Sequence, residues 1–484
     1  MPFRTTVAAP GKVLVVGGYL VLDKKYNGLV IAVNSCVYTS VKTKKLDSLT
    51  NSFKVLVNSP QFTNGKWEYS VSLNTENNPP QSNTVLVEQD YTVSKNKNVF
   101  IETVLETFFG LLNYRNREEF ESLKGTDLEL LVVSDNDFYS QRHEFVDTII
   151  SSKKLSELPK FNFTKSSIED VKKTGLGSSA ALVTSLSSAL MIHFGFVSKQ
   201  SFLKNSGNND DKYFVHGFSQ YCHCLAQGKI GSGFDVSSAI FGSHIYQRFS
   251  PSSIEIAMQN KDPKSIMDAI DPKTKRIDST AKNISIPNGF KLVLADVNAG
   301  SNTPSMVSKV LQWRKNNPKD SNELWEEISR NNTKIFSLFD TLVDESSKNQ
   351  KLYDLAINKC SKTIASEWET TFQTETDCLL IIKLFSQIYE TNNKVRKLMK
   401  LMGDKAGVEV EPDQQTKLLD QCLSSPGVIM AGVPGAGGYD AIYCMCLSEE
   451  SAQLLESTVW KVPEFKVTPL LSRQSDSGCF VTEL

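Results

Sequence analysis

The stretch Lys172-Lys173-Thr174-Gly175-Leu176-Gly177-Ser178-Ser179-Ala180-Ala181 is a glycine- and serine-rich turn that runs into an apolar segment with helical spacing. Glycine has no Cβ, so the backbone can turn tightly and approach a ligand closely. The helix that follows directs unpaired N–H groups and the positive end of its dipole at the turn. Such an arrangement favours phosphate. We name residues 172–181 the glycine–serine loop and predict a phosphate site there, with an ordinary loop-to-helix turn as the alternative.

Two common nucleotide-binding motifs do not explain this loop. Gly175, Gly177 and Ala180 fit the loose dinucleotide fingerprint, but residues 168–173 are too charged for a central parallel strand. No acidic residue follows at the expected distance after a second strand, and the chain lacks a GxxxxGK[ST] sequence. The sequence therefore argues against both a Rossmann fold and an ordinary P-loop fold.

The composition describes an ordinary globular protein rather than a specialised one. The chain has 484 residues, of which 40% are hydrophobic and 22% charged, and its net charge is −1. That length favours two domains, and the charge gives no global attraction to nucleic acid or to an anionic membrane. No apolar run reaches the length of a membrane span, so we expect no membrane insertion.

Nine cysteines are scattered along the chain, mostly within apolar runs. Their odd number and placement indicate reduced thiols in a cytoplasmic protein. The triplet Cys222-His223-Cys224 resembles a metal cluster, but no second Cys/His pair stands at a zinc spacing, and its surroundings predict a helix. We therefore treat these three residues as part of a helix.

The pattern of apolar and turn residues predicts an α+β fold. Candidate strands lie at residues 13–16, 36–41, 53–57, 67–73, 128–133, 292–295, 427–431, 441–446 and 465–470. Candidate helices lie at residues 100–112, 214–227, 304–314, 323–342, 378–402 and 449–459, besides the one after the glycine–serine loop. Asn64-Gly65 is a hairpin signal between two of the strands, and the polar residues 250–290 look like a crossover between domains.

Three further segments carry chemistry-bearing residues beside glycine or proline. They are Pro10-Gly11-Lys12, the aspartate loop (residues 228–235, with Gly231-Ser232-Gly233-Phe234-Asp235) and the glycine turn (residues 434–440, with Gly435-Ala436-Gly437-Gly438). Each segment alone is weak evidence, because tight turns explain it equally well. Together with the glycine–serine loop they need a common explanation.

In their order and spacing, three of these segments (Pro10-Gly11-Lys12, the glycine–serine loop and the glycine turn) resemble the three ordered motifs of the GHMP small-molecule kinases, and the resemblance covers nearly the whole chain. It implies a two-domain GHMP kinase fold, in which an N-terminal domain like domain 2 of ribosomal protein S5 joins a ferredoxin-like C-terminal domain. We expect these domains at residues 1–255 and 289–484, with a crossover segment at 256–288. Within the family, the motif wording is most similar to members that phosphorylate 5-phosphomevalonate.

The resemblance implies transfer of the γ-phosphoryl group of ATP, with Mg²⁺, to the phosphate of 5-phosphomevalonate. Lys12 and Asp235 match the family's catalytic lysine and aspartate. The nucleotide phosphates are expected at Lys173, Thr174, Gly175, Leu176, Gly177, Ser178, Ser179 and Ala180. Ser178 and Ser179 are the candidates for contact with Mg²⁺. The alternatives are a solvated Lys12, helix capping by the two serines, and helix N-capping by Asp235.

The acceptor site is expected around Lys12, Gly18, Tyr19, Lys229, Ser232, Gly233, Asp235, Ser301, Gly437 and Gly438. Lys229 stands where the mevalonate kinase branch carries a metal-binding glutamate. We expect Lys229, with Lys172 or Lys173 and Arg142, to clamp the anionic acceptor. A solvated lysine at a helix end is the alternative.

The polar turn around residues 134–140 is expected to line the base or ribose pocket through Ser134, Asn136 and Ser140, unless it is a surface loop. A phosphate acceptor is largely ionised at neutral pH, because its second pKa is about 6. Asp235 therefore acts either as a base or as a group that orients Lys12.

Two rival functions remain open at this point. The first alternative is another GHMP small-molecule kinase such as mevalonate kinase. The second is a catalytically inactive GHMP-fold protein that only binds ligand. We expect a monomer or a weak dimer with small-molecule partners and no nucleic acid. We also expect it in the cytoplasm, since Val481-Thr482-Glu483-Leu484 is not the S-K-L peroxisomal address.

Overall fold

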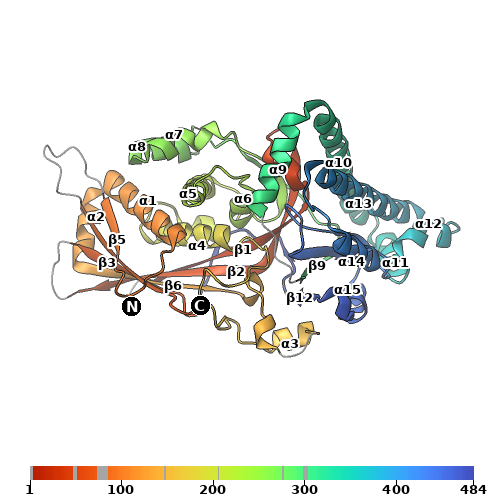
Figure 1. Cartoon of the computed structure of the whole chain (residues 1–484), viewed down its shortest axis with the longest axis horizontal. Coiled ribbons are helices and arrows are strands. Elements are labelled where there is room, and N and C mark those ends of the chain that lie inside the picture. The colour runs from red at the N-terminus through yellow and green to blue at the C-terminus, as the bar shows by residue number, and fades with distance from the viewer. Residues whose placement is uncertain are drawn as a thin grey trace.

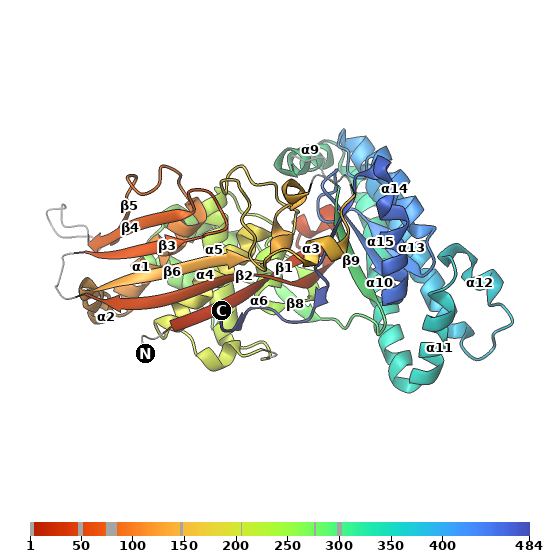
Figure 2. The ribbon, with the colours of Figure 1, turned by 90° about the horizontal axis from the view of Figure 1, so that it is seen from below.

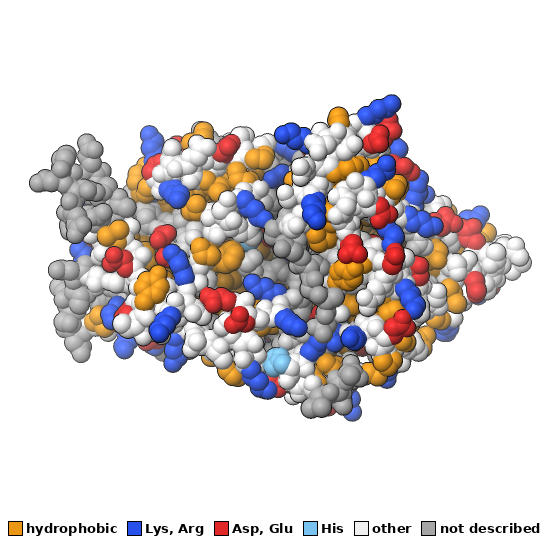
Figure 3. All heavy atoms as spheres, viewed as in Figure 1, with side chains coloured by type: hydrophobic (Ala, Val, Ile, Leu, Met, Phe, Trp, Pro, Cys, Tyr) orange, Lys and Arg blue, Asp and Glu red, His pale blue; other side chains and the backbone are white. Residues whose placement is uncertain are grey.

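Two sheets with their helices make up the molecule, which a computed structural model describes over residues 4–46, 52–73, 85–145, 149–204, 206–274, 277–297 and 303–484. Figure 1 shows the first sheet and its helices at the left and the second sheet with its helices at the right. The predicted α+β class is confirmed. On the face drawn in Figure 3, basic and acidic side chains are interspersed, in keeping with the small net charge.

Among the described residues the first sheet has ten strands, with β14-β1-β2-β6-β3-β4-β5 as its main order. β13 and β7 pair with β2, and β8 pairs with β7. All pairs are antiparallel except β3 with β6. The strands are β1 (Arg4–Val16), β2 (Asn27–Lys45), β3 (Phe53–Asn58), β4 (Lys66–Leu73), β5 (Val85–Gln89), β6 (Thr126–Ser134), β7 (His244–Gln247), β8 (Thr280–Asn283), β13 (Gln474–Ser475) and β14 (Phe480–Val481).

The predicted hairpin between β3 and β4 is confirmed. Asn64 has a φ of 58°, and a Cβ on Gly65 would lie 2.1 Å from the carbonyl oxygen of Ser59. The turn therefore needs glycine at that position.

Most helices of the first domain cover one face of its sheet, whereas α3 lies on the opposite side, as Figures 1 and 2 show from two directions. α4 contacts β1, β2, α1, α5 and α6. These helices are α1 (Val99–Arg115), α2 (Arg117–Ser122), α3 (Ser152–Ser156), α4 (Ser178–His193), α5 (Asp210–Gln227), α6 (Phe234–Phe241), α7 (Ser252–Asn260) and α8 (Pro263–Ile270). α7 and α8 lie within the segment predicted as a crossover. The segment packs against the domain through an apolar face that is buried, formed by Ile254, Ala257, Ile266 and Ala269.

The second sheet has four antiparallel strands among the described residues, in the order β10-β11-β9-β12. They are β9 (Lys291–Asp296), β10 (Val428–Gly432), β11 (Ala441–Cys446) and β12 (Thr468–Leu470). The accompanying helices are α9 (Thr303–Asn316), α10 (Pro318–Lys348), α11 (Gln350–Cys360), α12 (Trp368–Thr371), α13 (Leu379–Ala406), α14 (Asp413–Leu423) and α15 (Glu449–Ser457). The predicted helices and strands of this half are found near their expected places, except that the last strand begins only at Thr468, because Phe465 ends a 3-10 helix.

Short 3-10 helices complete the chain. They are η1 (Gly18–Leu22), η2 (Leu123–Gly125), η3 (Asn136–Phe138), η4 (Arg142–Glu144), η5 (Lys199–Phe202), η6 (Ala365–Glu367), η7 (Val459–Lys461) and η8 (Pro463–Phe465). In the described part of the chain, no helix has the length and apolarity required to cross a membrane.

The chain returns to the first sheet at its end. β13 pairs with β2 and β14 pairs with β1, so both lie beside strands from the start of the sequence. The hydroxyl of Ser472 donates a hydrogen bond of 2.6 Å to the carboxylate of Asp137, which follows β6. The predicted domain limits remain a prediction, and these two strands belong to the first sheet although they follow the second.

Candidate active site

The glycine–serine loop leads into α4 through two glycines in the left-handed region. Gly175 and Gly177 have φ angles of 82° and 81°, and Gly177 is the N-cap of α4. Gly175 is exposed and Leu176 is buried, so the loop is anchored by its apolar residue and open at its glycine. The first-turn N–H groups of α4 have no side-chain cap from Gly177. This geometry is suited to an anion.

The entry to the loop is fixed by residues that follow β6. The hydroxyl of Thr174 donates to the carbonyl oxygen of Asp137, and the N–H of Thr174 donates to Phe138 at 3.2 Å. Lys173 forms an isolated bridge with Tyr139. Because the side chain of Thr174 is 1% exposed, it holds the loop in place rather than facing a ligand.

Lys12 lies directly against the glycine–serine loop. A register shift of β1 between Pro10 and Lys12 interrupts the ladder with β2 here. The backbone N–H of Lys12 donates to Leu176 at 2.9 Å, and its Nζ donates to the carbonyl oxygen of Gly175 at 3.0 Å. Its Nζ also lies 5.2 Å from the ring centre of Phe234, the first residue of α6.

Asp235 is in the first turn of α6, where the helix dipole stabilises a carboxylate. Gly233 precedes it with a φ of 84°, and a Cβ there would lie 2.7 Å from Oε1 of Gln220. Burial lowers the pKa of Lys12, and the nearby negative charge of Asp235 opposes this shift. The structure thus brings Lys12, the glycine–serine loop and Asp235 together.

His223 is a member of this site that the sequence interpretation missed. It projects from α5, is 3% exposed, and its Nε2 lies 3.1 Å from the hydroxyl oxygen of Ser179. Burial lowers the pKa of His223, Asp235 opposes this shift, and Lys12 adds to it. Only the unusual His between two cysteines marks it in the sequence. Within the described ranges, no group of three His, Cys, Asp or Glu residues could hold a metal ion.

Arg248 was also missed by the sequence interpretation. It directly follows β7 and donates hydrogen bonds to the carbonyl oxygens of Leu22, Ile230 and Gly231. Arg248 thereby ties η1 to the aspartate loop. An arginine after a strand has no local signal that would identify these distant carbonyl groups.

The glycine turn connects the second domain to β1. Gly435 donates its N–H to Leu14 at 3.3 Å, and the hydroxyl of Tyr19 donates to Ala436 at 2.9 Å. A Cβ on Gly437 would lie 2.1 Å from the carbonyl oxygen of Val410, so this position requires glycine. The turn therefore sits between β1, which carries Lys12, and the segment around Val410.

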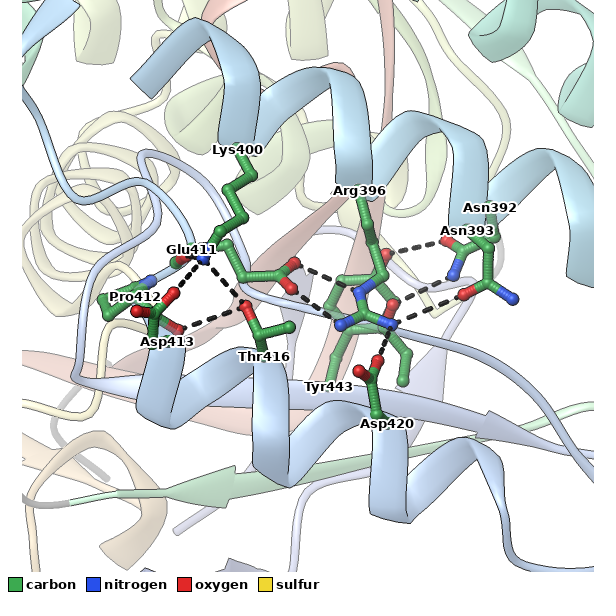
Figure 4. Close-up of polar contacts among 11 residues, drawn as sticks. Asn392, Asn393, Arg396, Lys400, Glu411, Pro412, Asp413, Thr416, Asp420 and Tyr443 are labelled. Carbon is green, nitrogen blue, oxygen red and sulfur yellow. Dashed lines mark hydrogen bonds and ion pairs between the residues drawn. The ribbon is translucent and has the colours of Figure 1, made fainter. Parts of the chain in front are cut away.

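A buried ion pair holds the segment beneath the glycine turn (Figure 4). Arg396 of α13 donates from Nε and Nη2 to Glu411 at 3.1 and 2.6 Å, and from Nη1 to Asp420 at 3.0 Å. The hydroxyl of Tyr443 donates to the carbonyl oxygen of Val15 in β1 at 3.0 Å. The ion pair thus holds the second domain together, and the Tyr443 contact fixes that domain to the strand that carries Lys12.

Several predicted residues make other contacts. Ser140 and Arg142 both contact the carboxylate of Asp296 in β9, at 3.0 and 3.2 Å, and so connect the two domains. The backbone N–H and the hydroxyl of Ser134 both donate to Oε1 of Gln61, at 2.6 and 3.3 Å. Asn136 donates to Pro159 at 2.8 Å. A base or ribose role for Ser134, Asn136 and Ser140 stays a prediction.

The residues predicted to bind the acceptor lie in several segments of the chain. Lys172, Lys173 and Lys229 are exposed, and Lys229 follows the C-terminal end of α5. Ser232 accepts a hydrogen bond of 2.7 Å from Tyr246 through its carbonyl oxygen. Ser301 lies outside the described residues.

Known proteins resemble this chain over nearly its whole length. The family described as GHMP kinases C terminal matches residues 382–461. The peroxisomal phosphomevalonate kinase of Arabidopsis thaliana is 33% identical over 97% of this chain and 94% of its own. The phosphomevalonate kinase of Candida albicans is 33% identical over 93% of this chain and 91% of its own.

A solved structure with the same fold is the Streptococcus pneumoniae phosphomevalonate kinase in complex with phosphomevalonate and AMPPNP. It matches with a TM-score of 0.57 at 13% identity, over 98% of this chain and 100% of that chain. At that identity the similarity shows the fold alone. The expected two-domain GHMP kinase fold is confirmed.

Proposed function

This chain belongs to the phosphomevalonate kinase family, and from that premise we propose that it transfers the γ-phosphoryl group of ATP to the phosphate of 5-phosphomevalonate. The products are 5-diphosphomevalonate and ADP. The single observation that carries this proposal is the contact of Lys12 with the glycine–serine loop, close to Asp235. A cation, a phosphate cradle and a carboxylate are the parts that phosphoryl transfer requires from a protein.

The ATP polyphosphate is placed on the glycine–serine loop at residues 173–180. Gly175 leaves room for it, Gly177 leaves room for the side chain of Lys12 beside it, and the N-terminal end of α4 supplies backbone N–H groups and positive dipole charge. The ammonium group of Lys12 donates to the carbonyl oxygen of Gly175 in this loop. When ATP binds, the same group is within reach of the phosphates and neutralises charge on the transferring phosphoryl group.

Asp235 acts chiefly by orienting Lys12. The attacking oxygen belongs to a phosphate that is already largely ionised at neutral pH, so a strong base is not required. The carboxylate favours the charged form of Lys12 against the effect of burial. It also remains available to accept a residual proton from the acceptor.

Mg²⁺ fits the donors present at this site. Mg²⁺ bound with nucleotides uses one or two protein oxygens, the substrate phosphates and water. The half-buried hydroxyls of Ser178 and Ser179 at the start of α4 supply such oxygens. Bound there, Mg²⁺ would neutralise charge on the ATP phosphates.

The acceptor is placed between the first domain and the glycine turn. We assign Gly18, Ser232, Gly233, Gly437 and Gly438 to its surroundings. Tyr19 acts by holding the turn, since its hydroxyl is committed to Ala436. The exposed ammonium group of Lys229 is suited to the carboxylate or phosphate of the acceptor. We no longer assign Arg142 to the group of cations that binds the acceptor, because its guanidinium group pairs with Asp296.

We place the enzyme in the cytoplasm as a monomer or a weak dimer, although one plant relative bears the name "peroxisomal". The function is tested by incubating the pure protein with ATP and mevalonate, phosphomevalonate or diphosphomevalonate in turn. We expect ADP only with phosphomevalonate, and no CO₂. Turnover of mevalonate would instead identify another GHMP kinase, and no turnover with any acceptor would favour an inactive ligand-binding protein.

A further inference from the structure

The side chains of Ser179, His223 and Gln227 meet at one nitrogen atom. Nε2 of His223 lies 3.1 Å from the hydroxyl oxygen of Ser179 and 3.2 Å from the amide nitrogen of Gln227. Ser179 belongs to the glycine–serine loop, whereas His223 and Gln227 are one turn apart on α5. This contact therefore connects α5 to the start of α4.

The donor inventory of the three groups fixes the direction of both hydrogen bonds. A side-chain amide nitrogen can only donate, so Nε2 of His223 must be the acceptor. A ring nitrogen that accepts carries no hydrogen, so the hydroxyl of Ser179 can only donate to it, and the two donors share the single lone pair of Nε2. The only hydrogen of that hydroxyl is then directed at His223, and its lone pairs are directed elsewhere.

The imidazole ring is held firmly enough to impose this direction. His223 is 3% exposed, and its ring stacks on Phe100 of α1 at 5.7 Å between centres and 25° between planes. Its Nε2 contacts Ser179 of the glycine–serine loop and Gln227 of its own helix, and Oε1 of Gln227 would lie 3.8 Å from a Cβ built on Gly231 of the aspartate loop. The ring thus has little freedom to release Ser179.

We propose that His223 is a positioning residue that makes Ser179 a lone-pair donor to the cation bound with the nucleotide, rather than a hydrogen-bond donor to phosphate. The inference rests on the proposed function and goes beyond it, because it separates the roles of the two serines. The side chain of Ser178 contacts Tyr139 rather than His223, while Ser179 presents oxygen lone pairs. Partners of metal ligands commonly change metal affinity about 10- to 100-fold when they are removed.

The test compares His223→Leu and His223→Gln with the wild-type enzyme, using Mn²⁺ as a paramagnetic probe. Electron paramagnetic resonance measures Mn²⁺ binding to the full chain with a non-hydrolysable ATP analogue. We expect His223→Leu to weaken Mn²⁺ binding about tenfold, with metal-free binding of the analogue unchanged. His223→Gln places an amide oxygen near the position of Nε2 and restores most of the affinity.

Two further variants distinguish positioning from a structural role. His216 is buried on the same helix without contacting the glycine–serine loop, so His216→Leu is the matched control. It should change thermal stability but not Mn²⁺ binding. Ser179→Ala should weaken Mn²⁺ binding as much as Ser179→Ala combined with His223→Leu, because the two residues act as a unit.

The inference is overturned if His223→Leu behaves like His216→Leu, or if the two substitutions at His223 and Ser179 weaken Mn²⁺ binding additively. Its failure is distinct from failure of the proposed function. Normal turnover of phosphomevalonate with unchanged Mn²⁺ binding in His223→Leu rejects only the positioning role. Loss of Mn²⁺ affinity in His223→Leu supports the positioning role even if another acceptor is the true substrate.

Discussion

The ammonium group of Lys12 has two neighbours of different kinds in the structure. It donates to the carbonyl oxygen of Gly175 at 3.0 Å, and it lies over the ring of Phe234. Both contacts suit a cation, but neither neutralises its charge. The group is therefore available to an anionic ligand on the glycine–serine loop.

Removing this charge should impair the chemical step more than the binding of ATP. We expect Lys12→Ala to lower kcat about 100- to 1,000-fold, as for the loss of one preorganised transition-state donor. The substitution Lys264→Ala, at an exposed position of α8, serves as the control. Steady-state kinetics with phosphomevalonate measure both, and a Lys12→Ala enzyme with wild-type kcat would exclude the proposed role.

The protonation of Lys12 provides a second prediction at this scale. Burial lowers its pKa below the ordinary 10.5, and Asp235 opposes this effect. Because Asp235→Asn removes the opposing charge, the pKa of Lys12 should fall further, so that the ammonium form is lost at lower pH. NMR titration of ¹³C-methylated lysines, with Lys12→Arg to assign the signal, measures the shift. A pKa that rises in Asp235→Asn would contradict this electrostatic pairing.

Residues of the site differ in how far the sequence reveals them. Lys12 and Asp235 stand beside glycines in recognisable motifs, and the structure brings them together at the loop. His223 contacts Ser179, which is 44 positions away, and Arg248 contacts carbonyl groups that are 17 to 226 positions away. Such partnerships depend on how α5 and β7 pack, which no local pattern records.

At the scale of elements, the junction between the loop and α4 depends on backbone geometry. Gly175 and Gly177 have nearly equal positive φ angles, but their surroundings differ. A Cβ on Gly175 meets nothing within 4 Å, whereas one on Gly177 would lie 2.9 Å from Cε of Lys12. Alanine at Gly175 would therefore strain only the backbone, whereas alanine at Gly177 would also displace Lys12.

Alanine at either position should cost about 1 kcal/mol of stability, because a left-handed conformation is unfavourable for residues with a Cβ. We expect Gly177→Ala to lose additional activity, at least tenfold beyond Gly175→Ala, since it displaces the lysine. Chemical denaturation and kcat should be measured for both variants. Equal losses of activity would show that the position of Lys12 does not matter.

The ion pair between α13 and the segment before α14 gives a prediction about stability. Arg396 contacts Glu411, which is 4% exposed, and Asp420, which is 63% exposed. Arg396→Met leaves Glu411 buried without its partner and should cost about 3 to 5 kcal/mol. Asp420→Asn removes only the exposed partner and should cost about 1 kcal/mol or less. Urea denaturation measures both, and similar losses would contradict the difference in burial.

Most helices and strands could be predicted because their apolar residues recur at regular spacing. The helix at 323–342 and the strands around Asn64-Gly65 are examples, and both are present. The two-residue strands β13 and β14 are too short for any periodicity. Their pairing with β2 and β1 depends on contacts across more than 400 positions, so the sequence pattern could not reveal it.

At the scale of the whole molecule, the two domains are joined by contacts that converge on β1 and on the loop after β6. Tyr443 reaches Val15, Tyr19 reaches Ala436, and Arg142 reaches Asp296. Each contact connects residues more than 150 positions apart. The strand that carries Lys12 is therefore held directly by the second domain.

The return of the chain to the first sheet has a consequence for biosynthesis. A ribosome releases the N-terminal domain long before β13 and β14, which must wait until the whole second domain has been translated. Synthesis at about 5 to 20 residues per second makes this delay on the order of tens of seconds. During that interval β1 exposes an unpaired edge, which is a surface that molecular chaperones recognise and that neighbouring nascent chains can join.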